Sequence, residues 1–133
     1  MKTSAWGLTT LRLVVGAIFM MHGGQKLFIF GFHNVAGMMS HLGVPLPRFF
    51  GVVVTLVEFL GGLGLVVGLL TRWAAFFLAI DMVVAILKVH LPHGFFGPMG
   101  YEFPLSLLAA SLALMLSGPG AAAIDNVIGH RHG

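Results

Sequence analysis

Residues 49–70, FFGVVVTLVEFLGGLGLVVGLL, are apolar almost throughout and contain a single charged side chain, Glu58. As an α-helix rising about 1.5 Å per residue, this stretch would span roughly 33 Å, close to the thickness of a bilayer's hydrocarbon core. Glu58 would then lie near the midplane, where a charge costs at least ~2.5 kcal/mol on insertion scales. A carboxylate at this depth requires a partner, a proton or a function, so Glu58 is the first candidate site residue.

The composition of the whole chain supports a membrane location. Of its 133 residues, 58% are hydrophobic and 8% are charged, and the mean hydropathy is +1.00. A soluble domain usually has about 25% charged residues. The chain therefore has too little polar surface to coat a water-soluble globule, and its length suits one integral membrane domain, residues 1–133.

The apolar segments predict an all-α fold, a bundle of four transmembrane helices. We expect the spans at about residues 8–30, 49–70, 73–88 and 104–117. A short amphipathic helix is predicted between the first two spans, either at the interface or tucked under the bundle, because apolar side chains recur there at i, i+3, i+4 and i+7, namely Val35, Met38, Met39 and Leu42. Thr71-Arg72 is predicted to form a tight turn, and the residues after Ser117 to form a small-residue tail.

Charged and polar side chains predict a seam inside the bundle. At about 100° per residue, His22 and Lys26 fall roughly 80° and 40° from Arg12, on the same side of the first span. Asp81 and Lys88 are seven residues apart and share a side of the third span. Because intramembrane charges usually face the protein interior, Arg12, His22, Lys26, Glu58 and Asp81 form the predicted ligand or proton site.

The second loop supplies the predicted rim of that site. Residues 90–104 are rich in glycine, proline and aromatic side chains, and His93, Tyr101 and Glu102 are placed at the rim together with Lys88 from the third span. Such a loop can cap a pocket or anchor at headgroup level, and Glu102 can also cap the following helix.

Two interpretations of the seam stay open at this stage. In the first, the charges are structural, and Arg12 pairs with Glu58 or Asp81 to fix the helix register. In the second, they form a pocket that handles protons or holds a ligand. The two interpretations are compatible.

Several functions are excluded or disfavoured. The chain has no cysteine, which removes disulfides, thiolate catalysis and cysteine-ligated metals, so a redox role would need a bound cofactor or a partner. Scattered basic residues argue against nucleic acid binding. No histidine spacing matches a known metal site, and none is predicted. The glycine-rich stretch 61–68 lacks a following Lys-Ser/Thr and is expected to pack helices, for example through Gly64-xxx-Gly68.

Four spans would place both termini on one side of the membrane. That side carries Lys2, Arg72 and Arg131, and the other carries Lys26, Arg48 and Lys88. Arg12 adds to the first group, so the weak positive-inside bias favours cytoplasmic termini.

A series of motifs resembles the DoxX family of small membrane proteins. The motifs cover nearly the whole chain in the right order: Leu11-Arg12, Gly16, HGGQKLF at 22–28, EFLGGLGL at 58–65, GLLTR at 68–72, HGFF at 93–96, GYEFPL at 100–105 and GPG at 118–120. The resemblance implies a four-helix integral membrane protein of bacteria or archaea, and we expect a multi-pass protein of the cell inner membrane. The family takes its name from subunits associated with thiosulfate:quinone oxidoreductase, and some members are linked to membrane-associated redox complexes. Carried over residue by residue, the family pattern points to these positions of the chain: Arg12, Gly23, Lys26, Glu58, Gly61, Arg72, Gly100 and Glu102.

The leading hypothesis is therefore a membrane component of a redox system, possessing a site for a quinone or another small apolar ligand. Glu58 would be the central acceptor or proton site, His22 and Lys26 would donate to a carbonyl, and Arg12 and Asp81 would set the charge balance. A redox partner and a homo-oligomer are expected. The alternatives are a non-enzymatic scaffold or assembly protein and a small proton-coupled transporter in which Glu58 and Asp81 relay protons.

Overall fold

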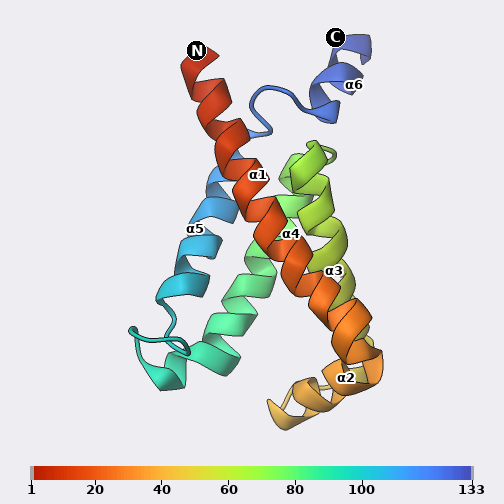
Figure 1. The fold of residues 1–133 in the computed structure, drawn as a ribbon, viewed down its shortest axis with the longest axis vertical. Coiled ribbons are helices and arrows are strands. Elements are labelled where there is room, and N and C mark those ends of the chain that lie inside the picture. The colour runs from red at the N-terminus through yellow and green to blue at the C-terminus, as the bar shows by residue number, and fades with distance from the viewer. Residues whose placement is uncertain (1, 133) are drawn as a thin grey trace.

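The computed structural model describes the backbone of residues 2–132, whose regular structure is helical throughout (Figure 1). This confirms the predicted all-α fold. Two segments, η1 and η2, are π-helical, and η3 is a short 3₁₀ turn. The elements in chain order are α1 (Lys2–Gly24), η1 (Gln25–Phe30), α2 (Gly31–His41), α3 (Pro47–Val67), α4 (Thr71–Ala85), η2 (Ile86–His90), η3 (Leu91–His93), α5 (Glu102–Ser117) and α6 (Ile124–His132).

The long helices are suited to a bilayer. Three helical stretches, Thr3–His41, Pro47–Val67 and Thr71–His93, are long and apolar enough to cross one, and α5 is a shorter apolar helix. The 16 residues of α5 span only about 24 Å. Large apolar side chains such as Phe28, Leu60 and Trp73 face outward. Exposed apolar side chains of this kind suit contact with lipid, so the fold is a helical membrane bundle.

Close contact between α1 and α3 forms the centre of the bundle, and glycines on both helices permit it. A methyl group on Gly23 would overlap the backbone of Phe59, and one on Gly62 would overlap the backbone of Met20. A methyl group on Gly16 would lie 2.8 Å from the carbonyl oxygen of Gly62. The packing role expected for the glycine-rich stretch is thus filled by Gly62 and also by Gly68, which lies against Arg12 and Ala123.

The short helix α2 lies tucked against α3, the second of the two predicted placements (Figure 1). Its Val35 and Ala36 are buried. They face Gly51 of α3, where an added Cβ would lie 3.2 Å from the nitrogen of Ala36. Small residues on both partners therefore allow α2 to cover the lower half of α3.

The connection between α3 and α4 differs from the predicted Thr71-Arg72 turn. Gly68 ends α3 with a φ of 73°, and Leu70 adopts a φ of 50° immediately before α4. Thr71 is already the first residue of α4 and is fully buried. The turn lies earlier because Gly68 reaches the left-handed region without the steric cost that a side chain carries.

The predicted small-residue tail contains a further helix, α6, at the same end of the bundle as the start of α1 (Figure 1). The backbone nitrogen of Ala121 donates to Ala5, and that of Asp125 donates to Gly68. The segment therefore closes this end across α1 and the α3–α4 turn. The side chains of the final His-Arg-His lie outside the described residues.

Candidate functional site

Glu58 finds its partner in Lys26, at the level where α1 approaches α3 most closely. Gly23 brings the α1 backbone against Phe59, and Lys26 lies one turn further along, in η1. Its Nζ donates to Glu58 Oε1 at 2.5 Å. The two side chains are 19% and 5% exposed, respectively. The costly intramembrane carboxylate is thus matched by a cation from the neighbouring helix.

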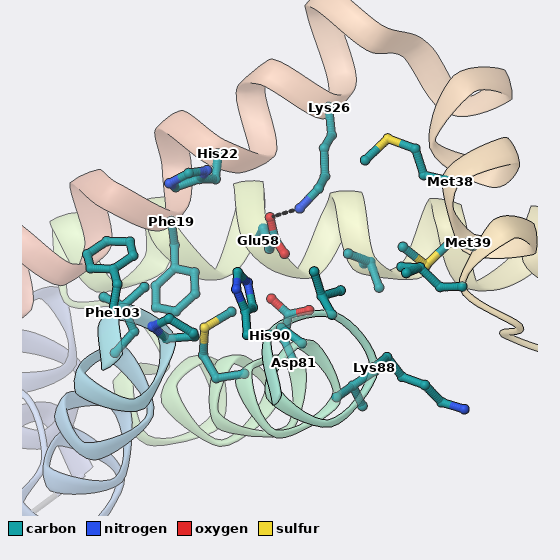
Figure 2. A pocket seen from close by; sticks show the side chains of 18 of the residues that line it. Phe19, His22, Lys26, Met38, Met39, Glu58, Asp81, Lys88, His90 and Phe103 are labelled. Carbon is teal, nitrogen blue, oxygen red and sulfur yellow. Dashed lines mark hydrogen bonds and ion pairs between the residues drawn. The ribbon is translucent and has the colours of Figure 1, made fainter. Parts of the chain in front are cut away.

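A cavity of about 370 Å³ lies beside this ion pair (Figure 2). Helices α1 to α5 all contribute to its walls. The apolar part of the lining consists of Phe19, Met38, Met39, Leu42, Val44, Val54, Met82, Val84, Ala85, Val89, Pro98, Phe103, Pro104 and Leu107.

Two carboxylates face each other in this cavity. Glu58 of α3 and Asp81 of α4 both line it, and their carboxylates point toward one another (Figure 2). Oδ2 of Asp81 is buried and has no hydrogen-bond partner among the described residues. Because a buried polar atom without a partner is costly, Asp81 offers a vacant hydrogen-bonding position at the wall of the cavity.

Two other residues predicted at the site, His22 and Lys88, also line the cavity. His22 lines the cavity on α1, although its side chain is exposed. Lys88 also lines it, but its side chain is exposed and extends away from the carboxylates (Figure 2). Lys88 thus lies at the edge of the cavity (Figure 2).

His90 is a cavity residue that the sequence did not single out. Its ring lines the cavity from η2, and Nδ1 lies 2.9 Å from the carbonyl oxygen of Met99. The π-helical segment alters the direction of its side chains relative to a regular α-helix, and π-helical turns are frequent at functional sites. No pattern in residues 86–90 indicates that segment, so helical arithmetic could not place His90.

The remaining rim residues, His93, Tyr101 and Glu102, are not among those that line the cavity. The loop folds back on itself, because Tyr101 donates a backbone hydrogen bond to Gly94 and the Tyr101 ring packs edge-on against Phe95. Pro98 and Phe103 lie at the cavity in their place. Glu102 is in the first turn of α5, as expected for an acidic residue at a helix N-terminus.

Arg12 belongs to a separate cluster near the termini. Its side chain is only 1% exposed, and Nη2 donates to the carbonyl of Ala122 at 2.9 Å. Thr9 donates beside it to Ala121 at 2.7 Å. The predicted pairing of Arg12 with Glu58 or Asp81 is therefore wrong. Fourteen residues separate Arg12 from Lys26, about 21 Å along a helix, so Arg12 lies too far from the cavity.

Asp125 is a second residue that the sequence did not single out. Its two carboxylate oxygens accept from the backbone nitrogens of Leu70 and Thr71, at 2.6 and 2.9 Å. It therefore caps the N-terminus of α4 from a position 54 residues away. Capping motifs are recognised in sequence by local spacing, and this one has none.

The part of the chain that the structure describes contains no group of three or more histidine, cysteine or acidic side chains that could hold a metal ion. Its chemistry instead rests on an ion pair, a second carboxylate and two histidines within an apolar lining.

Residues 7–91 match the sequence profile of the DoxX family. This chain belongs to the DoxX family. The matched region runs from α1 through η2 and includes Lys26, Glu58, Asp81 and His90. An uncharacterized membrane protein of Mycobacterium tuberculosis is 36% identical over 91% of this chain and 80% of its own length.

Two other relatives carry more informative names. A Bacillus subtilis protein named "Putative oxidoreductase CatD" is 33% identical over 93% of this chain and 88% of its own length. The inner membrane protein YqjF of Escherichia coli is 31% identical over 92% of each. No solved structure matched the chain.

Proposed function

We propose that this DoxX-family protein is a membrane component of a redox system and that its cavity binds a quinone-like ring or another small apolar ligand. The observation that carries the proposal is the cavity itself, a mostly apolar space beside the Lys26–Glu58 ion pair. Ligand sites typically combine apolar walls with a few convergent polar groups, and this cavity does so within a membrane bundle.

The dimensions of the cavity suit a single ring. Its volume of about 370 Å³ lies near the lower end of the roughly 300–1,000 Å³ typical of small-molecule sites. Phe19 and Phe103 offer aromatic surfaces, and Met38 and Met39 offer adaptable ones. A ring with polar substituents could bury its faces against these side chains and direct its oxygens toward Lys26 and the carboxylates.

The redox assignment is supported by the relative named as an oxidoreductase. Because this chain has no cysteine, electrons would have to pass between the ligand and a separate protein. We therefore include a redox partner, and a homo-oligomeric assembly, in the proposal. The inner-membrane location is supported by the Escherichia coli relatives that carry this description in their names.

A scaffold function is the second candidate, and one observation favours it. The ion pair lies where α1 and α3 approach most closely, so it could serve mainly to fix their register. A scaffold would need the pair but no ligand in the cavity, and this difference can be measured.

Equilibrium dialysis of ubiquinone-1 against the protein in lipid nanodiscs tests the proposal. Intrinsic fluorescence is a poor reporter, because Trp6 and Trp73 lie near the helix ends opposite the cavity. We expect saturable binding that Glu58→Gln weakens at least about tenfold, because the charge of Glu58 holds the Lys26 ammonium that donates to a quinone carbonyl. Glu102→Gln is the matched control, because Glu102 lies outside the cavity. Unsaturable partitioning equal to that of empty nanodiscs would contradict the ligand site and favour the scaffold.

A further inference from the structure

The polar groups of the cavity differ in what they can still bind. Lys26 directs one N–H to Glu58 and, as an ammonium, retains others that can donate. On the opposite side, Oδ2 of Asp81 is buried and has no hydrogen-bond partner among the described residues. The cavity thus has donors on its α1 side and an unused oxygen on its α4 side.

The hydrogen bond of His90 fixes the character of its other ring nitrogen. The partner of Nδ1 is the carbonyl oxygen of Met99, which can only accept. Nδ1 must therefore carry the proton, and in the neutral ring Nε2 is left with a free lone pair. Because this ring lines the cavity, His90 provides a second acceptor close to Asp81.

Asp81 can accept a hydrogen bond from the ligand when its carboxyl group is ionised, and also when it is protonated with the proton directed toward Glu58. An ionised carboxylate only accepts hydrogen bonds. A protonated carboxyl group carries one proton, on a hydroxyl that donates, and keeps a second oxygen that accepts. If Asp81 holds that proton and directs it toward Glu58, its second oxygen still accepts.

We propose that the cavity selects the reduced, hydroxyl-bearing form of its ring ligand, a quinol or phenol, through acceptance by Asp81 and His90. This inference rests on the proposed function. A hydroxyl group donates its one hydrogen to Asp81 Oδ2 or to His90 Nε2 while its oxygen accepts from Lys26. A quinone carbonyl only accepts, so it would direct lone pairs at Asp81 Oδ2 and His90 Nε2 and leave both without a partner.

Three ligands of nearly equal shape separate these possibilities. Ubiquinol-1, ubiquinone-1 and the dimethyl ether of ubiquinol-1 are dialysed anaerobically against the protein in nanodiscs. The ether keeps the ring and its oxygens but has no hydroxyl donor. We expect ubiquinol-1 to bind at least about tenfold more tightly than the other two.

Matched variants assign the preference to its residues. His90→Asn keeps an amide that can donate to Met99 but removes the accepting Nε2, and the exposed His93, outside the cavity, provides the control His93→Asn. Asp81→Asn introduces an amide donor. We expect His90→Asn and Asp81→Asn each to reduce the preference for ubiquinol-1 by about threefold or more, while His93→Asn leaves it unchanged.

The outcomes distinguish this inference from the proposed function. Equal binding of the three ligands, or tighter binding of ubiquinone-1, would overturn the selectivity while leaving the ligand site in place. A preference for ubiquinol-1 that survives both Asp81→Asn and His90→Asn would overturn the assignment to these residues. Absence of saturable binding by any of the three would overturn both.

Discussion

Nζ of Lys26 lies 2.5 Å from Oε1 of Glu58, and the pair joins η1 to α3 one helical turn from the contact between Gly23 and Phe59. The glycine makes the ion pair reachable, because any side chain at position 23 would hold the two backbones apart. The close backbone contact and the ion pair therefore lie at nearly the same level of the bundle, beside the cavity.

Breaking the ion pair should be costlier than removing it. Lys26→Met leaves Glu58 with an uncompensated carboxylate and should destabilise the fold by about 3 kcal/mol, whereas adding Glu58→Gln should recover most of that loss. Unfolding in mixed detergent–SDS titrations, arranged as a double-mutant cycle, gives the coupling energy. Lys88→Met is the control, because Lys88 is exposed and has no recorded ion pair among the described residues. Additive effects of the two substitutions would show that the pair is not coupled.

Adjacent glycines should respond oppositely to the same substitution. Gly23→Ala inserts a methyl group into the backbone of Phe59 and should cost about 1–3 kcal/mol or more, as overpacking does. At Gly24 the added Cβ would lie 3.8 Å from the Phe59 ring, an ordinary contact, so Gly24→Ala should be neutral or stabilising by up to about 1 kcal/mol. The same detergent titration compares them. Similar stabilities for the two variants would mean that α1 and α3 are further apart than described.

The C-terminal segment should contribute to stability through Asp125. Asp125→Ala removes both acceptors of the α4 cap and should destabilise the protein by about 1–2 kcal/mol. Glu102→Ala is a matched control, since Glu102 also lies at a helix N-terminus but has no side-chain hydrogen bond recorded there. Thermal unfolding followed by circular dichroism measures both. A melting temperature for Asp125→Ala no lower than that for Glu102→Ala would argue against the cap.

The distribution of Lys and Arg between the two ends of the bundle predicts the membrane orientation. Lys2, Arg12, Arg72 and Arg131 lie toward the termini, against Lys26, Arg48 and Lys88 at the other end. The first group is larger by one residue, so the weak positive-inside bias predicts cytoplasmic termini. Alkaline phosphatase fused after Gly133 should be inactive, and the enzyme inserted at Gly97 should be active. The reverse activities would show the opposite orientation.

The sequence predicts the apolar helices of this molecule well, because a membrane-spanning helix requires a long run of apolar residues. The α-helical spacing of about 100° per residue put His22 and Lys26 on one side of the first span, and both line the cavity, although Lys26 lies in the π-helical η1. The same spacing did not identify His90, which reaches the cavity from η2.

Long-range contacts account for the other differences. Arg12 binds backbone carbonyls of Ala121 and Ala122, and Asp125 caps α4 across 54 residues. The amino-acid sequence does not indicate which backbone carbonyls accept hydrogen bonds from a buried arginine. The pattern of charges therefore predicted that Arg12 pairs with a carboxylate. Only the folded position of the C-terminal segment shows that this end of the bundle is closed separately from the cavity.

A crystal structure with a brominated ubiquinol-1 analogue, solved with anomalous data at the bromine edge, tests the central claim most directly. We predict one dominant bromine peak inside the cavity between Lys26, Glu58 and Asp81, and its loss in Glu58→Gln crystals grown under the same conditions. A dominant peak on the lipid-facing surface, with the cavity filled only by side chains, would contradict the account.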